Sequence, residues 1–232
     1  RVKNLPQRIQ ALAWHPQGQW LAVGGGSPGQ SGEVALVDGT TGEVAKVLAT
    51  TIDTVMTLAF APDGSRLAAG GADNAIRILS VPDGKELWLL QQHADWVLGL
   101  AFSPDGKTLY VAETETGRLW AWDIEGPGKL KKEPWPSSAG GRVLCQFPGY
   151  RRLDSIAIAA SGNIIVAPLV AGEITTVSPS GEILRTVKMP ERMPTNICFG
   201  GPDMRTAYIT LSNTGKLVAM QWDEPGLRLP HN

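Results

Sequence analysis

The sequence predicts an all-β fold made of five repeated units, and a recurring heptapeptide is the main reason. Leu-Ala-Phe-Ala-Pro-Asp-Gly at 58–64 returns as Leu-Ala-Phe-Ser-Pro-Asp-Gly at 100–106 and, more loosely, as Leu-Ala-Trp-His-Pro-Gln-Gly at 12–18. Weaker copies stand at 156–162 and 197–203. A period of about 40 to 45 residues built of short strands is typical of a β-propeller blade. We therefore expect a single β-propeller with five four-stranded blades.

Composition agrees with this fold class and excludes several functions. The 232 residues include 27 Gly and 17 Pro, which predicts many turns and little helix. The net charge of −1 predicts no binding to nucleic acid or to an anionic membrane surface. No run of about 18 apolar residues is present, so we expect a soluble protein. No signal peptide is visible in a chain that begins at Arg1.

The cysteine content is low and does not identify the cellular compartment. Cys145 and Cys198 are the only cysteines. Two cysteines make no disulfide framework, so we expect two reduced thiols packed as small apolar side chains. A disulfide between them is the alternative. This usage is compatible with cytoplasmic expression.

The second repeat shows how each blade is expected to form. An apolar strand at 54–60 ends at the turn residues Pro62-Asp-Gly64, and further strands follow at 66–69, 75–79 and 85–90. Inner strands are apolar at most positions because neighbouring blades would pack on both of their faces, and outer strands alternate more.

The other blades are expected at 9–49, 96–135, 141–190 and 194–223. Blade four is expected to hold the longest insertion, around 129–136. Blade five shows only three clear strands. The segment 1–5 would supply its fourth strand and close the ring, which would remove exposed sheet edges. The tail at 227–229 competes for the same place.

The first part of the chain resembles WD-repeat proteins. The residues that carry the resemblance lie within about 9–110: the heptapeptide at 58–64, Gly-Gly-Ala-Asp-Asn-Ala-Ile-Arg-Ile at 70–78 and His-Ala-Asp-Trp-Val at 93–97. The Trp-Asp pair that names the repeat is absent from the first two blades. The resemblance implies a propeller that binds other proteins on its top face, and it makes His93 a structural loop histidine.

The second part resembles the gluconolactonase family, which includes senescence marker protein and luciferin-regenerating enzyme. Segments 109–123, 154–163 and 195–203 carry this resemblance within about 100–232. It implies a six-bladed propeller with a divalent metal in its central channel and hydrolysis of lactones. We place the boundary between a WD-like part, 1–99, and a gluconolactonase-like part, 100–232. The shared motif at 100–110 suggests an engineered or recombined chimera, and a natural hybrid with drifted blades is the alternative.

Equivalent positions on the inner strands predict the composition of the channel. Counting four residues back from the aromatic residue or Ile of each repeat selects a ring of Gln10, Met56, Leu98, Asp154 and Thr195. The resemblance implies a metal held by a Glu from the first blade, an Asn at the ring position of a middle blade and an Asp in a later one. Asp154 matches that Asp, Leu98 stands where the Asn should be, and no residue matches the Glu.

Asp154 is thus the only candidate metal ligand in the ring, and a solvated carboxylate at the channel mouth is the simpler interpretation. Asp53 and Asp95, in loops before inner strands, could contribute to a site. His15, His93 and His231 share no spacing typical of metal ligands. We therefore expect no cofactor, with Ca²⁺ or Zn²⁺ only if the lactonase site survives.

These observations favour a non-catalytic hybrid propeller that serves as a scaffold or binding module. Two alternatives stay open: a metal-dependent lactonase or esterase with a degraded site, and a WD-type protein-interaction module. We expect a monomer that could bind a protein or a small molecule at the channel mouth.

Overall fold

The computed structural model describes residues 5–91, 93–126, 129–135, 137 and 139–228, and these residues form five antiparallel sheets. The strands of the first two sheets are β1 (Ile9–Trp14), β2 (Trp20–Ser27), β3 (Ser31–Asp38), β4 (Val44–Thr51), β5 (Val55–Phe60), β6 (Arg66–Gly71), β7 (Ile76–Ser80) and β8 (Glu86–Leu90). Those of the third are β9 (Val97–Phe102), β10 (Thr108–Glu113), β11 (Arg118–Gly126), β12 (Lys129–Leu130) and β13 (Arg142–Gln146). Those of the last two are β14 (Leu153–Ile158), β15 (Ile164–Pro168), β16 (Glu173–Val177), β17 (Ile183–Lys188), β18 (Pro194–Gly200), β19 (Thr206–Leu211) and β20 (Lys216–Gln221).

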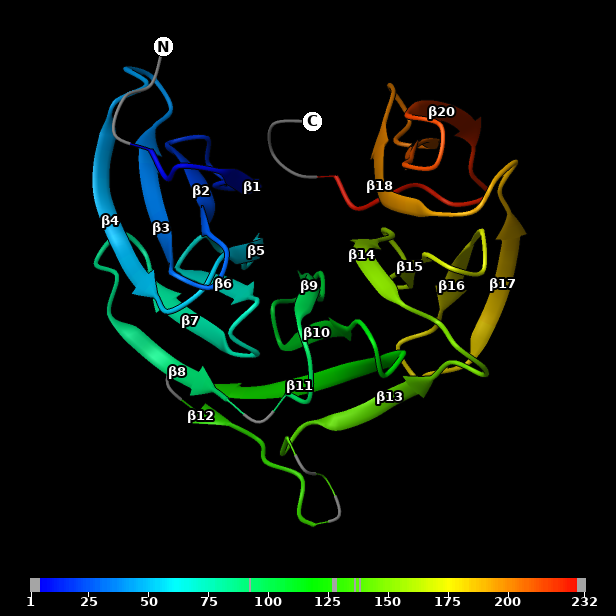
Figure 1. Ribbon diagram of the computed structural model, residues 1–232, viewed down its shortest axis with the longest axis horizontal. Coiled ribbons are helices and arrows are strands. Elements are labelled where there is room, and N and C mark those ends of the chain that lie inside the picture. Colours follow the sequence, from blue (N-terminus) through cyan, green and yellow to red (C-terminus); the bar gives the residue numbers. More distant parts are fainter. Residues whose placement is uncertain (1–4, 92, 127–128, 136, 138, 229–232) are drawn as a thin grey trace.

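The sheets are the blades of a β-propeller, so the predicted fold class and the number of blades are confirmed (Figure 1). In each blade the chain runs outward from an inner strand, and the inner strands of neighbouring blades pack in the order β1, β5, β9, β14, β18. The first and fifth blades stand at the two ends of this arc (Figure 1). No helix occurs in the described part of the chain that is long and apolar enough to span a membrane.

The boundary between the third and fourth blades differs from the prediction. Strand β13 pairs with β11 and is the outer strand of blade three, whereas the sequence placed it at the start of blade four. The long insertion therefore belongs to blade three and lies between its third and fourth strands. Lys129 and Leu130 of this insertion form the short strand β12 against the end of β11. The recurring heptapeptide marks inner strands only, so it carries no information on which blade owns an outer strand.

Blade five has three strands among the described residues, as expected, and its closure is only partly visible. Residues 1–4 of the expected closing segment lie outside the described residues, and Leu5 is in no strand. The competing tail takes a different course, because the Leu227 N–H donates to the Ile158 carbonyl of β14 and not to β20. A bridge between Ala159 and Gly226 completes this contact. The tail therefore ties blade five to blade four.

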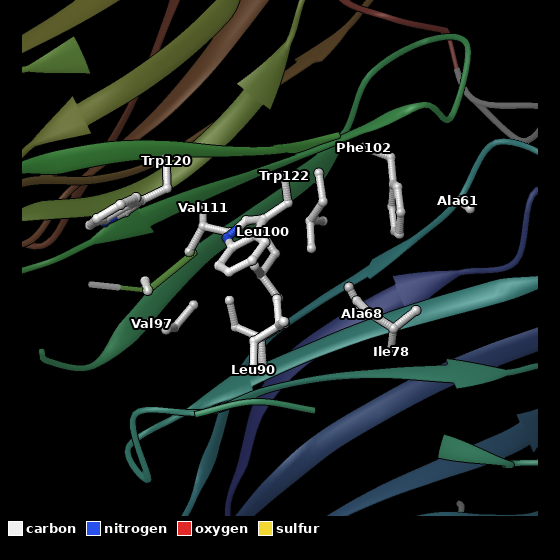
Figure 2. Packing of buried hydrophobic residues seen from close by; sticks show 13 residues of the cluster. Ala61, Ala68, Ile78, Leu90, Val97, Leu100, Phe102, Val111, Trp120 and Trp122 are labelled. Carbon is white, nitrogen blue, oxygen red and sulfur yellow. The ribbon is translucent and has the colours of Figure 1, made fainter. Parts of the chain in front are cut away.

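The core consists of the side chains that fill the spaces between blades. Between blades two and three, Trp120 and Trp122 pack with aliphatic residues of both sheets, including Ile78, Leu90 and Leu100 (Figure 2). Both indoles are almost completely buried. Large aromatic side chains bury the most surface, and here they fill the space between two blades.

Candidate functional site at the central channel

The ring positions predicted from the repeats share one structural feature. In every blade the register between the inner strand and its neighbour shifts at this point, between Ile9 and Ala11 in β1 and between Val55 and Thr57 in β5, for example. The same shift occurs in β9, β14 and β18. The residues at these shifts are Gln10, Met56, Leu98, Asp154 and Thr195. Such β-bulges change the direction of a side chain and are frequent beside functional sites.

A cavity of about 250 Å³ lies among the inner strands. Three ring residues, Gln10, Met56 and Leu98, line it. Ser155 and Asn196, the neighbours of the other two ring residues, also line it. The cavity thus collects side chains from all five blades, although the ring itself contributes one amide, one thioether and one hydrocarbon side chain to its wall.

Asp154 is the titratable group of this ring, and its environment is unusual. Burial raises the pKa of its carboxyl group to about 6, an effect that Arg152 opposes only in part. The described residues supply its carboxylate with neither a hydrogen bond nor an ion pair within 4 Å. The adjacent Ser155 hydroxyl is also buried without a hydrogen-bond partner among the described residues. A desolvated carboxyl group beside an unsatisfied hydroxyl is typical of a binding site rather than of a surface.

The donor set around Asp154 does not fit a divalent metal ion. A hard cation such as Ca²⁺ takes six to eight oxygen ligands, and Zn²⁺ needs three or four nitrogen, sulfur or oxygen ligands. Met56 offers a soft thioether and Leu98 offers no donor. No group of three or more His, Cys, Asp or Glu side chains with metal-binding geometry occurs among the residues that the structure describes.

Asp53 and Asp95, the loop carboxylates that could have completed a metal site, already accept hydrogen bonds from backbone N–H groups. Asp53 Oδ1 accepts hydrogen bonds from the N–H groups of Gly29 and Thr54, at 2.8 and 2.7 Å, and these lower the pKa of Asp53. Asp95 Oδ2 accepts one from the Glu115 N–H at 2.7 Å. Both carboxylates hold loops in place.

The histidines and cysteines within the described part of the chain also form no metal site. His15 Nε2 lies 3.2 Å from the Gly64 carbonyl oxygen, and His231 lies outside the described residues. Cys145 and Cys198 are both free, so the disulfide alternative is wrong.

A buried acidic network in blade three was not foreseen from the sequence. Glu113 is almost completely buried and accepts hydrogen bonds from the Ala94 N–H, Thr116 Oγ1 and Trp120 Nε1. His93 Nδ1 lies 3.6 Å from Glu113 Oε1. Burial alone would raise the pKa of Glu113, but these polar neighbours lower it to about 2. The sequence signal that could have indicated this network is the position of Glu113, an acidic residue at the end of the apolar strand β10.

This network is structural. All the donors point at one carboxylate, and Glu113 is only 1% exposed. It ties the loop before β9 to the turn between β10 and β11, which agrees with the structural role expected for His93.

Two family models match the sequence. The model described as SMP-30/Gluconolactonase/LRE-like region matches residues 66–213. The model described as WD domain, G-beta repeat matches residues 2–32 and 43–80. The two matches overlap at 66–80, in blade two. Both resemblances inferred from the sequence are thereby confirmed, and the boundary at residue 100 stays a prediction.

Curated relatives match the chain over about half of its length. A 6-deoxy-6-sulfogluconolactonase of Pseudomonas putida is 32% identical over 47% of the chain and 39% of its own length. A diisopropyl-fluorophosphatase of Loligo vulgaris is 26% identical over 51% of the chain and 36% of its own length. A regucalcin of Xenopus laevis is 32% identical over 47% of the chain and 35% of its own length. The chain thus spans less than two fifths of the length of these relatives.

A solved structure supports the fold alone. The β-propeller domain of Myceliophteria thermophila Cps50 (Swd1) superimposes with a TM-score of 0.69 at 16% identity, over 91% of this chain and 65% of that one. The family is shown by the gluconolactonase match, which covers more than half of the sequence, from blade two to the end of β19. By this match the chain belongs to the SMP-30/gluconolactonase/LRE-like family.

Proposed function

We propose that the chain is a non-catalytic member of this family that acts as a scaffold or binding module. The observation that carries the proposal is the composition of the bulged channel positions, where Asp154 is the only carboxylate and Met56 and Leu98 are apolar. Lactone hydrolysis of the type that the family resemblance implies needs a metal to polarise the carbonyl group and to activate water. A single carboxylate beside a thioether and a hydrocarbon side chain would bind such an ion weakly.

The mixed character of the chain supports a binding role. WD-like sequence builds the first blades, and the WD match ends within blade two. We expect a monomer that binds a protein or small molecule at the channel mouth. We also infer a hybrid origin, recombined or engineered, from the overlap of the two family matches at 66–80.

A metal-dependent lactonase or esterase with a degraded site is the second candidate. Asp154 favours it, because this carboxylate stands at the position that the family resemblance assigns to a metal ligand and has a raised pKa of about 6. The names of the curated relatives, which include a sulfogluconolactonase and a diisopropyl-fluorophosphatase, favour it as well.

Metal binding and lactone hydrolysis separate the two candidates. Purified protein dialysed against Ca²⁺ or Zn²⁺ is expected to retain less than one ion per chain by elemental analysis. Hydrolysis of δ-gluconolactone should equal the buffer rate. Stoichiometric metal together with hydrolysis that a chelator abolishes would refute the non-catalytic proposal and promote the lactonase.

The variant Leu98→Asn provides a rescue test. It restores an oxygen donor at the bulged position next to Asp154 in the ring, so metal affinity should rise measurably. Leu217→Asn is the matched control, because Leu217 lies on β20 and is 67% exposed, and it should leave metal binding unchanged. Equal metal binding by both variants would show that the bulged position does not face a potential metal site.

A further inference from the structure

A second cavity lies on the outer part of blade three, away from the channel. It has a volume of about 630 Å³ and is bounded by β11, β13 and the insertion between β12 and β13. Ligand-binding pockets typically measure about 300–1,000 Å³. Among its lining residues are Arg118, Trp120, Trp135 and Arg142. The insertion that the family repeat does not account for therefore forms one wall of a ligand-sized cavity.

The aromatic side chains give this cavity flat apolar walls. Trp135 is 89% exposed, although a large indole is usually buried against the protein. Trp120 forms another part of the wall, and its Nε1–H already donates to Glu113 Oε2 at 3.2 Å. Trp135 is thus suited to contact a planar ring through its face, since indole binds aromatic partners by stacking, whereas Trp120 is only 2% exposed and closes part of the wall.

The charges at the cavity are predominantly positive. The Arg118 guanidinium lies 5.9 Å from the centre of the Trp120 ring, and its Nε donates to Gln146 Oε1 at 3.0 Å. Its two Nη groups have no acidic partner within 4 Å among the described residues. Arg142 approaches Asp123 only at 3.9 Å. The unpaired face of a guanidinium group is the donor that best matches a carboxylate, because both groups are planar and two parallel hydrogen bonds can form.

The one carboxylate in the wall does not cancel this charge. Glu133 lies 3.1 Å from Lys131, so its charge is already compensated. Lys132 adds a further exposed cation to the same insertion. An anion entering the cavity therefore meets Arg118, which has no acidic partner among the described residues, and Arg142, whose ion pair with Asp123 is long at 3.9 Å.

We propose that this cavity binds a small anionic ligand that carries a planar aromatic ring, such as an aryl carboxylate. The carboxylate pairs with Arg118, with Arg142 adding positive potential, and the ring lies against the indole of Trp135. The site is independent of the channel and of the question of lactone hydrolysis. The protein would then bind a ligand at the outer part of blade three, although its channel ring has only one carboxylate.

Calorimetric titration with 2-naphthoate tests the proposal, with the neutral 2-naphthamide as the comparison ligand. We expect saturable binding of one naphthoate per chain and at least fivefold weaker binding of the amide, since a hydrogen bond to a charged group is worth about tenfold in affinity or more. The variants Arg118→Gln and Trp135→Ala should each weaken naphthoate binding at least fivefold.

Arg185→Gln is the matched control, because Arg185 also lies over an indole, 5.1 Å from the Trp222 ring centre, but lines neither cavity. It should bind naphthoate as the parent protein does. Trp135→Ala removes an exposed side chain and should leave the melting temperature unchanged, so it reports on the site even if Arg118→Gln is unstable. Absence of naphthoate binding, equal binding of the amide, or unchanged binding by Trp135→Ala would each overturn the proposal.

Discussion

Asp154 is a carboxyl group whose burial works against folding at neutral pH. Its pKa is raised from 3.8 to about 6 in the folded protein, so the folded state binds the proton more tightly than the unfolded chain does. Its contribution to stability is therefore largest in acid and falls as the pH rises from about 4 to about 6. Asp154→Asn, which stays neutral, should raise the free energy of unfolding by about 1–2 kcal/mol above pH 7 and change it little near pH 4.

Urea denaturation at both pH values measures this effect. Asp83→Asn is the control, since Asp83 is an exposed residue between β7 and β8, and it should leave the free energy of unfolding at neutral pH unchanged. A variant that is no more stable than the parent at neutral pH would mean that the Asp154 carboxylate is hydrated rather than desolvated.

Glu113 is a second residue whose ionisation affects stability, and its pKa is shifted in the opposite direction to that of Asp154. Its pKa is lowered from 4.5 to about 2, so the stability that it contributes is present above about pH 4.5 and is lost as the pH falls towards 2. Glu113→Gln would place an amide N–H₂ group among side-chain and backbone donors and should destabilise the fold by about 2–4 kcal/mol. Thermal unfolding at neutral pH checks this, with the exposed Glu182→Gln as control. A loss below about 0.5 kcal/mol would contradict the network's structural role.

At the scale of elements, small residues on second strands set the distance between blades. A Cβ added at Gly70 in β6 would lie 2.7 Å from Val97 Cγ1 of the next inner strand and 3.0 Å from Thr57 Cγ2. Gly70→Ala should therefore cost about 1–3 kcal/mol through overpacking, measured by chemical denaturation. Val97→Ala in the same chain should recover part of that loss, because the two residues are in contact.

Gly126→Ala is the control for this series, since a Cβ there would meet none of the described residues within 4 Å. If Gly70→Ala were as stable as Gly126→Ala, the blades would be free to move apart at no cost, and close packing at this strand would not determine their spacing.

At the scale of the whole molecule, the C-terminal tail holds the last blade. The Ala160 N–H donates to the Pro225 carbonyl and the Gly226 N–H donates to the Met204 carbonyl. The Glu224 carboxylate accepts hydrogen bonds from Ser161 and Asn163 of blade four. Removing residues 224–232 should lower the melting temperature by several degrees and increase hydrogen exchange in β18–β20 before the other blades.

Glu224→Gln keeps the backbone contacts and removes only the charge, so it should show a small part of this effect. Uniform hydrogen exchange over all five blades after truncation would contradict the idea that the tail acts on blade five. Among the described residues, blade five packs mainly against blade four, through β18 on β14 and β15, and this is why the loss is expected to concentrate there.

The strand repeat and the channel positions follow from the local sequence. Apolar inner strands that end at Pro-Asp-Gly turns are local signals, so the heptapeptide located all five inner strands and the equivalent residues from Gln10 to Thr195. The structure adds that each of these residues stands at a β-bulge. Spacing within one strand was enough to find them, because every blade repeats the same inner-strand geometry.

Other features depend on contacts between residues far apart in the chain, and these contacts exist in the folded protein alone. The assignment of β13 to blade three depends on pairing with β11 across the insertion, and the course of the tail depends on contacts with β14. The raised pKa of Asp154 and the lowered pKa of Glu113 follow from burial and from which donors surround each carboxylate. Two acidic residues that look alike in sequence acquire opposite properties, because desolvation and hydrogen bonding are set by packing.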